Sequence, residues 1–376
     1  MKSKSDRPLY KRINVQLDSR SYAIHIENGS LSRSGKRLKT ATKSKRFLIL
    51  SAPPVFKLFG NSLRKSIQRT NARVDCILVP DGERAKSEKN LFFILKKMAL
   101  FGLQKDSCLI ALGGGVIGDL GGLAASLYMR GIDFIQCPTT LLAQVDASIG
   151  GKTAIDFAGI KNLVGAFYQP KMVLIDPLAL KTLTERQLKT GLAEVVKYGI
   201  IKDEKLFTKV ENNLSLIFKR DPETLFSIIS RSCAIKAAIV SADERESGKR
   251  AWLNYGHTLG HALESYFGYQ ILTHGEAIAY GMWFAGLLSS RMGICNEHFV
   301  QVQYRLLKSI GLFRKLPRFD PGKIYEKMFL DKKARNGKIQ FVLTRKMGLV
   351  TIQKNIPRPI ILSALTQLQA ESSESY

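Results

Sequence analysis

The chain has 376 residues, of which 58 are Lys or Arg and 31 are Asp or Glu, so its formal net charge is +27. Apolar residues make up 45%, which is typical of globular proteins and excludes a wholly disordered or collagen-like chain. The length suggests two domains. The positive charge suits nucleic acid, a membrane surface or small anionic ligands, and it does not by itself distinguish them.

The cysteines and the apolar runs bear on the compartment. The five cysteines are widely spaced and form no CxxC motif, which indicates free thiols in a reducing cytoplasm. The basic N-terminal segment lacks the apolar core of a signal peptide. The best candidate for a membrane span, residues 277–290, is shorter than the ~20 residues that a spanning helix needs. We therefore expect a cytoplasmic protein that does not span a membrane.

Short runs of β-branched and aromatic residues predict strands in the first half, and helical stretches such as 87–101 separate several of them. The predicted strands are 13–17, 22–27, 47–51, 74–79, 107–112, 134–137 and 172–176. Strands that alternate with helices predict a largely parallel sheet. We assign residues 1–177 to a Rossmann-like α/β domain.

The pattern changes to helical periodicity after residue 177. The predicted helices are 185–201, 203–218, 224–243, 259–267, 276–292 and 297–310. Asp221-Pro222 and Asp320-Pro321 have the residue order of helix starts, with Asp as N-cap and Pro at the first helical position. Residues 339–344 and 349–352 predict a hairpin, and 371–376 predict a frayed polar tail. We assign residues 178–376 to a mostly α-helical domain.

A glycine-rich turn is the first chemical signal. The sequence GGGVIGD at 113–119 follows a predicted strand and precedes a predicted helix at 120–129. Such a turn lets backbone N–H groups approach a pyrophosphate at a helix N-terminus, although a packing turn has the same pattern. It departs from the dehydrogenase fingerprint because it follows a late strand and no ribose-binding acid is evident. The loop DGERAK at 81–86 also follows a predicted strand. It could contact a nucleotide, and it could equally be an ordinary turn before a helix.

Three of the five histidines, His257, His261 and His274, fall within 18 residues, which suggests a metal or acid–base site. His257 and His261 share one face if the segment is helical. Catalytic zinc typically takes three protein ligands, and Glu194 is the candidate carboxylate because a Glu among small apolar residues needs a partner. A pair between Glu194 and Lys197 is the alternative, and the spacing leaves both open.

Segment 146–162 combines paired glycines, hydroxyl groups, Lys152 and Lys161. These groups suit phosphate binding, and a solvated loop is the alternative. Asp146 stands where a Walker A motif would have Gly, so we do not expect a P-loop.

Several strings, taken together, resemble the 3-dehydroquinate synthase family of sugar phosphate cyclases. They follow one another in order between about residues 80 and 335. The most specific are PTTLLAQVD at 138–146, GGKT at 150–153, KNLVGAFYQP at 161–170, NYGHTLGH at 254–261 and HGEA at 274–277.

The resemblance implies a carbon–oxygen lyase of the shikimate pathway, which leads to chorismate and the aromatic amino acids. It implies conversion of 3-deoxy-D-arabino-heptulosonate 7-phosphate to 3-dehydroquinate and phosphate, by transient oxidation with NAD, phosphate elimination, reduction, ring opening and aldol cyclisation. It also implies a divalent metal, zinc or alternatively cobalt, and a homodimer. The partner is then a small substrate with phosphate and carboxylate groups, rather than nucleic acid or a membrane.

The resemblance assigns site residues in three groups. The metal ligands are Glu194, His257 and His274. The catalytic and substrate-binding residues are Arg130, which reaches in from a dimer mate, Asp146, Lys152, Asn162, Lys197, Lys236, Arg250, Asn254, His261 and Lys333. The NAD-binding residues are Asp81, Gly82, Glu83, Arg84, Ala85, Lys86, Gly115, Val116, Ile117, Gly118, Asp119, Thr139, Thr140, Lys152, Lys161, Ala179, Leu180, Lys181 and Thr182.

Two other functions compete with this one. Another sugar phosphate cyclase, or a metal-dependent NAD polyol dehydrogenase, could share the fold. A dehydrogenase would not need Arg130, Lys152, Arg250 and Lys333 together. A nucleic-acid-binding protein would need basic and aromatic residues interleaved on a recognisable module, and the sequence has none that we can identify.

Overall fold

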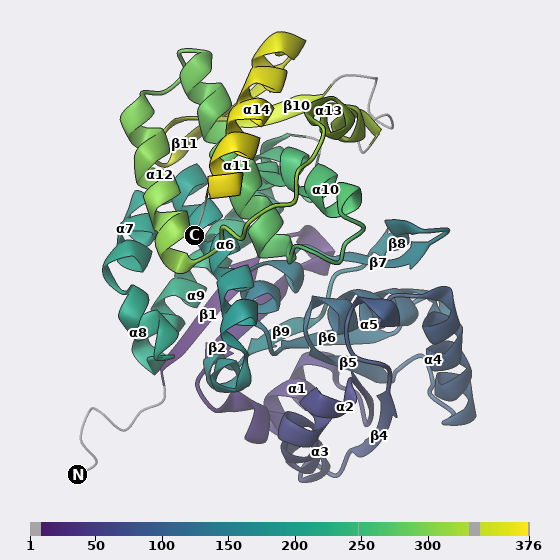
Figure 1. The fold of residues 1–376 in the computed structure, drawn as a ribbon. Helices are drawn as coiled ribbons and strands as arrows, with labels where there is room; N and C mark the ends of the chain where they lie inside the picture. Colours follow the sequence, from purple (N-terminus) through teal and green to yellow (C-terminus); the bar gives the residue numbers. More distant parts are fainter. Residues whose placement is uncertain (1–8, 247, 331–338, 375–376) are drawn as a thin grey trace, which may run out of the picture. The chain divides into compact units, whose positions relative to one another are not determined.

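The computed structural model describes residues 9–246, 248–330 and 339–374 (Figure 1). Contacts divide the chain into two compact units. Unit 1 is Met1–Leu183 with Lys219–Glu244, and unit 2 is Thr184–Phe218 with Arg245–Tyr376. The chain thus leaves the first unit shortly after the boundary we placed at residue 177, and it returns for one long helix.

Seven strands form one sheet within the described part of unit 1, in the order β1-β2-β9-β6-β5-β3-β4. Their bounds are β1 (Tyr10–Val15), β2 (Tyr22–Glu27), β3 (Arg46–Ser51), β4 (Arg73–Leu78), β5 (Cys108–Gly113), β6 (Asp133–Pro138) and β9 (Met172–Ile175). Only the β1–β2 pair among them is antiparallel. The largely parallel Rossmann-like sheet predicted from the sequence is confirmed.

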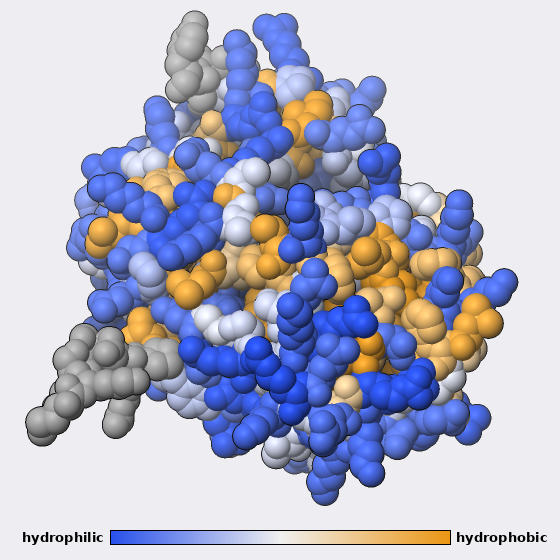
Figure 2. All heavy atoms as spheres, turned by 90° about the horizontal axis from the view of Figure 1, so that it is seen from below, coloured by the Kyte–Doolittle hydropathy of each residue, from blue (hydrophilic) through white to orange (hydrophobic). Residues whose placement is uncertain are grey.

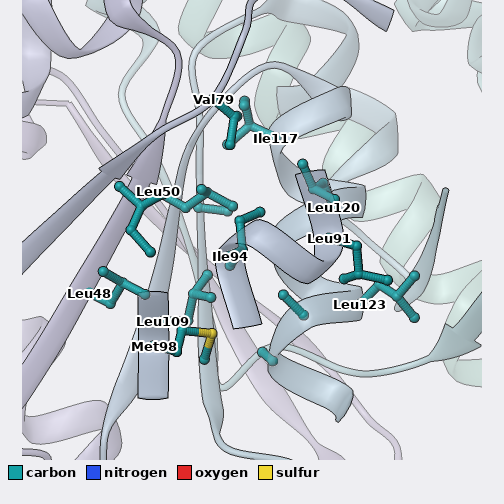
Figure 3. Close-up of a cluster of buried hydrophobic side chains, with 14 of the residues drawn as sticks. Leu48, Leu50, Val79, Leu91, Ile94, Met98, Leu109, Ile117, Leu120 and Leu123 are labelled. Carbon is teal, nitrogen blue, oxygen red and sulfur yellow. The ribbon is translucent and has the colours of Figure 1, made fainter. Parts of the chain in front are cut away.

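Helices cover both faces of this sheet because the central strands are apolar on both sides. In β3, Leu48 and Leu50 pack with helices α4 (Glu88–Leu100) and α5 (Gly115–Leu127), as Figure 3 shows. The alternate residues Phe47 and Ile49 face a second cluster, formed with α1 (Gly35–Thr42) and α3 (Asn61–Gln68). The short helix α2 (Pro53–Val55) follows β3.

Helix α9 (Pro222–Ala242) belongs to unit 1 and corrects one expectation. Its length and composition match those of a membrane-spanning helix, so residues 277–290 are not the best candidate. However, 56% of its apolar window is buried inside the protein, and it packs against β1 and β2. A buried helix of a globular protein passes the same test of length and composition.

A solvated loop was one alternative for segment 146–162. Residues 152–167 instead form a hairpin of β7 (Lys152–Phe157) and β8 (Ile160–Phe167). Ala158 and Gly159 connect the strands with φ of 51° and 76°, as a tight two-residue hairpin turn requires. Large apolar side chains are exposed along this hairpin, namely Phe157, Ile160, Leu163, Val164 and Phe167. Figure 2 shows one face of the protein, where hydrophobic side chains lie between hydrophilic ones.

Unit 2 is mostly helical, as predicted. Its elements are α6 (Glu185–Lys202), α7 (Glu204–Asn212), α8 (Leu214–Phe218), α10 (His257–Tyr266), α11 (His274–Arg291), α12 (Glu297–Ile310), α13 (Pro321–Leu330), the hairpin β10 (Gln340–Lys346) and β11 (Leu349–Lys354), and α14 (Arg358–Glu374). The predicted helix 203–218 is two helices because Asn213 is not helical (φ −125°, ψ 21°). The predicted frayed tail is helical through Glu374, and Leu368 is buried.

Both predicted Asp-Pro helix starts are confirmed. Asp221 Oδ2 accepts a hydrogen bond from the Thr224 N–H at 2.8 Å. Asp320 Oδ1 accepts one from the Gly322 N–H at 2.7 Å.

Candidate active site

Three helices of unit 2 bring the predicted metal ligands together. Glu194 lies in the middle of α6, while His257 and His274 are the first residues of α10 and α11. Glu194 Oε1 lies 3.6 Å from His257 Nε2 and 3.7 Å from His274 Nε2. One ligand atom from each residue lies within 4.8 Å of the other two, a spacing that a single metal ion can bridge.

Glycines allow these helices to approach so closely. A Cβ atom at Gly275 would overlap the backbone carbonyl of Thr190 on α6. A Cβ atom at Gly281 on α11 would overlap the carbonyl oxygen of Gly256, which directly precedes α10. The helix backbones are therefore in contact at these glycines. A larger residue at Gly275 or Gly281 would push the helices apart, and the predicted metal ligands with them.

A polar network fixes the start of α11. Arg186 of α6 donates from Nε and Nη2 to the two carboxylate oxygens of Glu276, at 2.9 and 2.8 Å. Glu276 and Thr273 form a reciprocal capping box around the first turn. Thr190 of α6 also donates to Thr273 Oγ1 at 3.0 Å. His274 is thus held between a cap and a bidentate ion pair.

The chemistry of Glu194 fits a bound cation. Its side chain is 0% exposed, and the imidazoles of His257 and His274 both lie within 3.7 Å of Oε1. Lys197 makes an ion pair with it. A buried carboxylate strongly favours further positive charge, and a divalent metal at the two imidazole nitrogens supplies it.

His257 is held in the form that ligates metals. Burial, followed by the positive charge of Lys197 and the neighbouring His261 and His274, holds its pKa well below the ordinary value. Its Nδ1 lies 3.1 Å from the backbone oxygen of Tyr255. If Nδ1–H donates to that oxygen, the lone pair is on Nε2, which faces Glu194.

A second carboxylate, Glu264, lies behind His274, with Glu264 Oε2 3.3 Å from His274 Nδ1. Burial lowers the pKa of His274, but the carboxylates of Glu194 and Glu264 outweigh it and raise the pKa to about 10. Our sequence interpretation missed Glu264. Its spacing of seven residues after His257 on one helix was the available signal, since such residues share a face.

The other predicted residues of unit 2 gather around the same helices. The ring of His261 lies 5.3 Å from that of His257. Asn254 Nδ2 donates to Glu246 Oε1 at 2.6 Å, and Arg250 is buried in the same short turn, Lys249–Asn254. Glu246 is a further carboxylate that we did not predict. Lys333 lies outside the described residues.

The predicted NAD-binding residues of unit 1 share one edge of the sheet. Residues 81–86 follow β4, 115–119 follow β5, 139–140 follow β6, and 179–182 follow β9. Because these strands are parallel, their carboxyl ends meet at the same edge. β3 lies between β4 and β5, so the strand order reverses there, and ligands of open α/β sheets bind outside such a point.

Lys86 connects several of these loops. It is 4% exposed, and its Nζ donates to Asp119 Oδ2 at 2.8 Å and to Asn162 Oδ1. Burial raises the pKa of Asp119 to about 6 against the opposing effect of Lys86. Lys161 Nζ lies 3.6 Å from Glu83 Oε1. The structure thus brings together side chains that we assigned separately to NAD and to substrate.

Other predicted residues of unit 1 have distinct settings. Lys236 Nζ donates to the backbone oxygen and to Oδ1 of Asp146, each at 2.6 Å. Ala179 and Leu180 are buried, so their backbone rather than their side chains would meet a cofactor. Lys152 begins β7, and Arg130 is exposed in a left-handed backbone conformation (φ 61°). The roles of these residues stay predictions.

Comparison with known proteins agrees with this geometry. The family model for the N-terminal part of 3-dehydroquinate synthase matches residues 76–190, and the C-terminal one matches residues 191–334. A 3-dehydroquinate synthase of Thermodesulfovibrio yellowstonii is 46% identical over 92% of this chain and 97% of its own length. One of Pelobacter propionicus is 44% identical over 94% and 99%.

Two solved structures share the fold along almost the whole chain. The 2-epi-5-epi-valiolone synthase ValA of Streptomyces hygroscopicus, with NAD+ and Zn2+ bound, has a TM-score of 0.87 at 28% identity and covers 95% of this chain and 99% of its own. A 2-deoxy-scyllo-inosose synthase with carbaglucose-6-phosphate, NAD+ and Co2+ has a TM-score of 0.85 at 26% identity, over 95% and 100%. From the family matches and the identity to its relatives, the chain belongs to the 3-dehydroquinate synthase family.

Proposed function

We propose that this enzyme converts 3-deoxy-D-arabino-heptulosonate 7-phosphate to 3-dehydroquinate and phosphate, using NAD and a divalent metal. The family membership supports the reaction. The observation that carries the metal-dependent step is the convergence of Glu194, His257 and His274, with Glu194 fully buried. The nitrogen and oxygen donors favour zinc, and they also suit cobalt.

Glu194, His257 and His274 would hold the metal, and the loops after β4, β5, β6 and β9 would hold NAD. When bound, NAD accepts and returns a hydride, and the metal acts as a Lewis acid on substrate oxygens. The chain itself supplies position and charge. The buried cations Lys197 and Arg250 of unit 2 would attract a substrate with phosphate and carboxylate groups.

Lys86 and Asp119 would position the cofactor loops. Their ion pair joins the residues after β4 to the first turn of α5, whose backbone N–H groups suit a pyrophosphate. Asn162 accepts a hydrogen bond from Lys86 as well, and this links the loops to the β7–β8 hairpin. We assign this cluster an orienting role in NAD binding.

We also propose a cytoplasmic homodimer. All five cysteines are free, which suits a reducing compartment. The exposed apolar side chains of the β7–β8 hairpin, such as Phe157 and Ile160, suit an interface between copies. In that dimer the partner's Arg130 would meet the substrate. Light scattering after gel filtration tests the dimer, and a monomer at working concentration would refute it.

A substrate panel tests the reaction against the other cyclases. The purified enzyme with NAD and zinc should form 3-dehydroquinate from the heptulosonate phosphate and should release little phosphate from glucose 6-phosphate. Preference for glucose 6-phosphate would identify another cyclase. Oxidation of an unphosphorylated polyol with release of NADH would identify a dehydrogenase.

A substitution tests the metal assignment separately. His257→Ala should lose bound zinc and activity while the far-ultraviolet circular dichroism stays that of a folded protein. His298→Ala, a surface histidine on α12, is the matched control and should keep both. Full zinc content in His257→Ala would refute the assignment of this ligand.

A further inference from the structure

The surface of unit 1 has an open cavity of about 640 Å³ that the proposed reaction does not use. It is lined by β1, β2, helix α1 and the start of β9. Its position follows from the alternation of the β1–β2 hairpin. Ile13 and Ile24 pair on one face, and Arg12 and His25 pair on the other.

The polar face of the hairpin lines the hollow. Arg12, Asn14, Ala23 and His25 line it from the strands, and Arg37, Thr40 and Ala41 line it from α1. Elsewhere α1 packs on the sheet through apolar residues such as Leu38. The small side chains of Ala23 and Ala41 leave space here.

The lining carries an excess of positive charge. Arg12, Arg37 and Lys171 line the cavity together with His25, and none of the described residues that line it is Asp or Glu. The two nearby acids are each paired with basic residues. Glu27 accepts from Arg37 at 2.6 Å and also pairs with Arg33, and Asp133 lies 3.7 Å from Lys171 Nζ.

His25 reports the potential inside the cavity. Burial, followed by the cations Arg37 and Arg12, lowers its pKa from 6.5 to about 4, and the raising effect of Glu27 is smaller than these. The imidazole is therefore neutral near pH 7, since burial and the positive charge of Arg37 and Arg12 both disfavour its protonated form. Tyr10 OH lies 3.0 Å from His25 Nδ1, so Nε2 is the ring nitrogen available to a ligand.

We propose that this cavity binds a small anion that carries a phosphate group. Arginine guanidinium groups bind phosphate oxygens by paired hydrogen bonds, and the Asn14 amide offers a further donor. The volume exceeds that of inorganic phosphate and admits a phosphate ester or diphosphate. The site is separate from the metal group, whose ligands all belong to unit 2.

Inorganic pyrophosphate is the test probe, and His25 is a local reporter. Of the five histidines, the three of the metal site and His298 lie in unit 2. The whole enzyme, labelled with ¹⁵N-histidine, is titrated at constant ionic strength while the imidazole resonances are recorded. The His25 signals, assigned through their loss in His25→Gln, should shift and saturate. Binding at the metal site alone would instead move the signals of His257, His261 or His274.

Charge-matched variants separate a built site from general attraction. Arg12→Gln should weaken pyrophosphate binding at His25 by about tenfold or more, as loss of a charge-assisted contact does. Lys11→Gln, the exposed neighbour on the same strand that does not line the cavity, should stay close to the unchanged enzyme. A second such pair is Lys171→Gln, at a residue that lines the cavity, and Lys36→Gln on α1, at one that does not. His25 signals that do not respond, or equal losses in the two members of each pair, would overturn the proposal.

Discussion

Glu264 Oε2 lies 3.3 Å from Nδ1 of His274, on the side of the imidazole opposite the atom that faces Glu194. A carboxylate in this position accepts the Nδ1–H and orients the ring, so that a metal which displaces the Nε2 proton would be bound through Nε2. Glu264 also shares a cluster with His261, in which the side-chain atoms lie within 4.8 Å of one another, and we assign it the role of positioning His274. The proposed metal centre thus includes two buried carboxylates, Glu194 among the predicted ligands and Glu264 behind His274.

Glu264→Gln should therefore weaken zinc binding by about tenfold to a hundredfold, because an amide is a weaker acceptor for the Nδ1–H. Competition with a chromophoric chelator on the metal-free protein measures this affinity directly. Glu326→Gln, an exposed acid on α13, is the charge-matched control. Equal zinc affinity in the two variants would contradict the positioning role.

Gly281→Ala should lower the free energy of unfolding by about 3 kcal/mol or more, because its Cβ atom would overlap the Gly256 carbonyl. The shift of α11 against α10 should also weaken zinc binding. Gly286→Ala on the same helix is the control, since its Cβ atom would come no closer than 3.3 Å to Gln303. Urea unfolding and a zinc titration compare the variants, and equal stability of the two would refute the argument from close packing.

The depressed pKa of His25 predicts an acid-dependent loss of stability. The folded state holds the pKa near 4 against 6.5 for the ordinary side chain, so between these values the unfolded chain binds more protons. The contribution of this group is present above about pH 6.5 and is lost as the pH falls through about 4, at no more than about 1.4 kcal/mol per pH unit.

His25→Gln removes that titration and should reduce the drop in thermal midpoint between about pH 7 and about pH 5. His298→Gln, with an exposed histidine, serves as the control and should behave like the unchanged enzyme. Saturating pyrophosphate should also reduce the drop in the unchanged enzyme, since an anion in the cavity raises the pKa of His25. An identical drop in all three proteins would contradict the assignment.

Much of the fold follows from local patterns in the sequence. The buried parallel strands are continuous apolar runs, such as 107–112, and these predictions agree with β5 and its neighbours. The Asp-Pro starts of α9 and α13 work because the N-cap interaction is local. The β7–β8 hairpin was not predicted because its turn places Ala158 in a left-handed conformation, which alanine rarely adopts. Asn213 ends α7 where helical periodicity continues into α8.

The site was predictable to a different degree. Histidine spacing and an isolated acid in an apolar helix single out His257, His261, His274 and Glu194 as candidates, and the family resemblance implies which of them are the ligands. Glu264 and Glu246 did not stand out, since each is one acid among many until the helices pack. The anion cavity was also invisible, because it depends on the register that places Arg12 beside His25. Contacts between segments distant in sequence carry this information.

In the proposed reaction, NAD is reduced and reoxidised within one turnover. Inorganic phosphate and NADH absorbance are followed together in one reaction with heptulosonate phosphate, zinc and a small amount of NAD. Because each NAD is recycled, phosphate should accumulate far beyond the NAD supplied, while NADH should not accumulate. NADH rising in step with phosphate, or no release of phosphate at all, would contradict it.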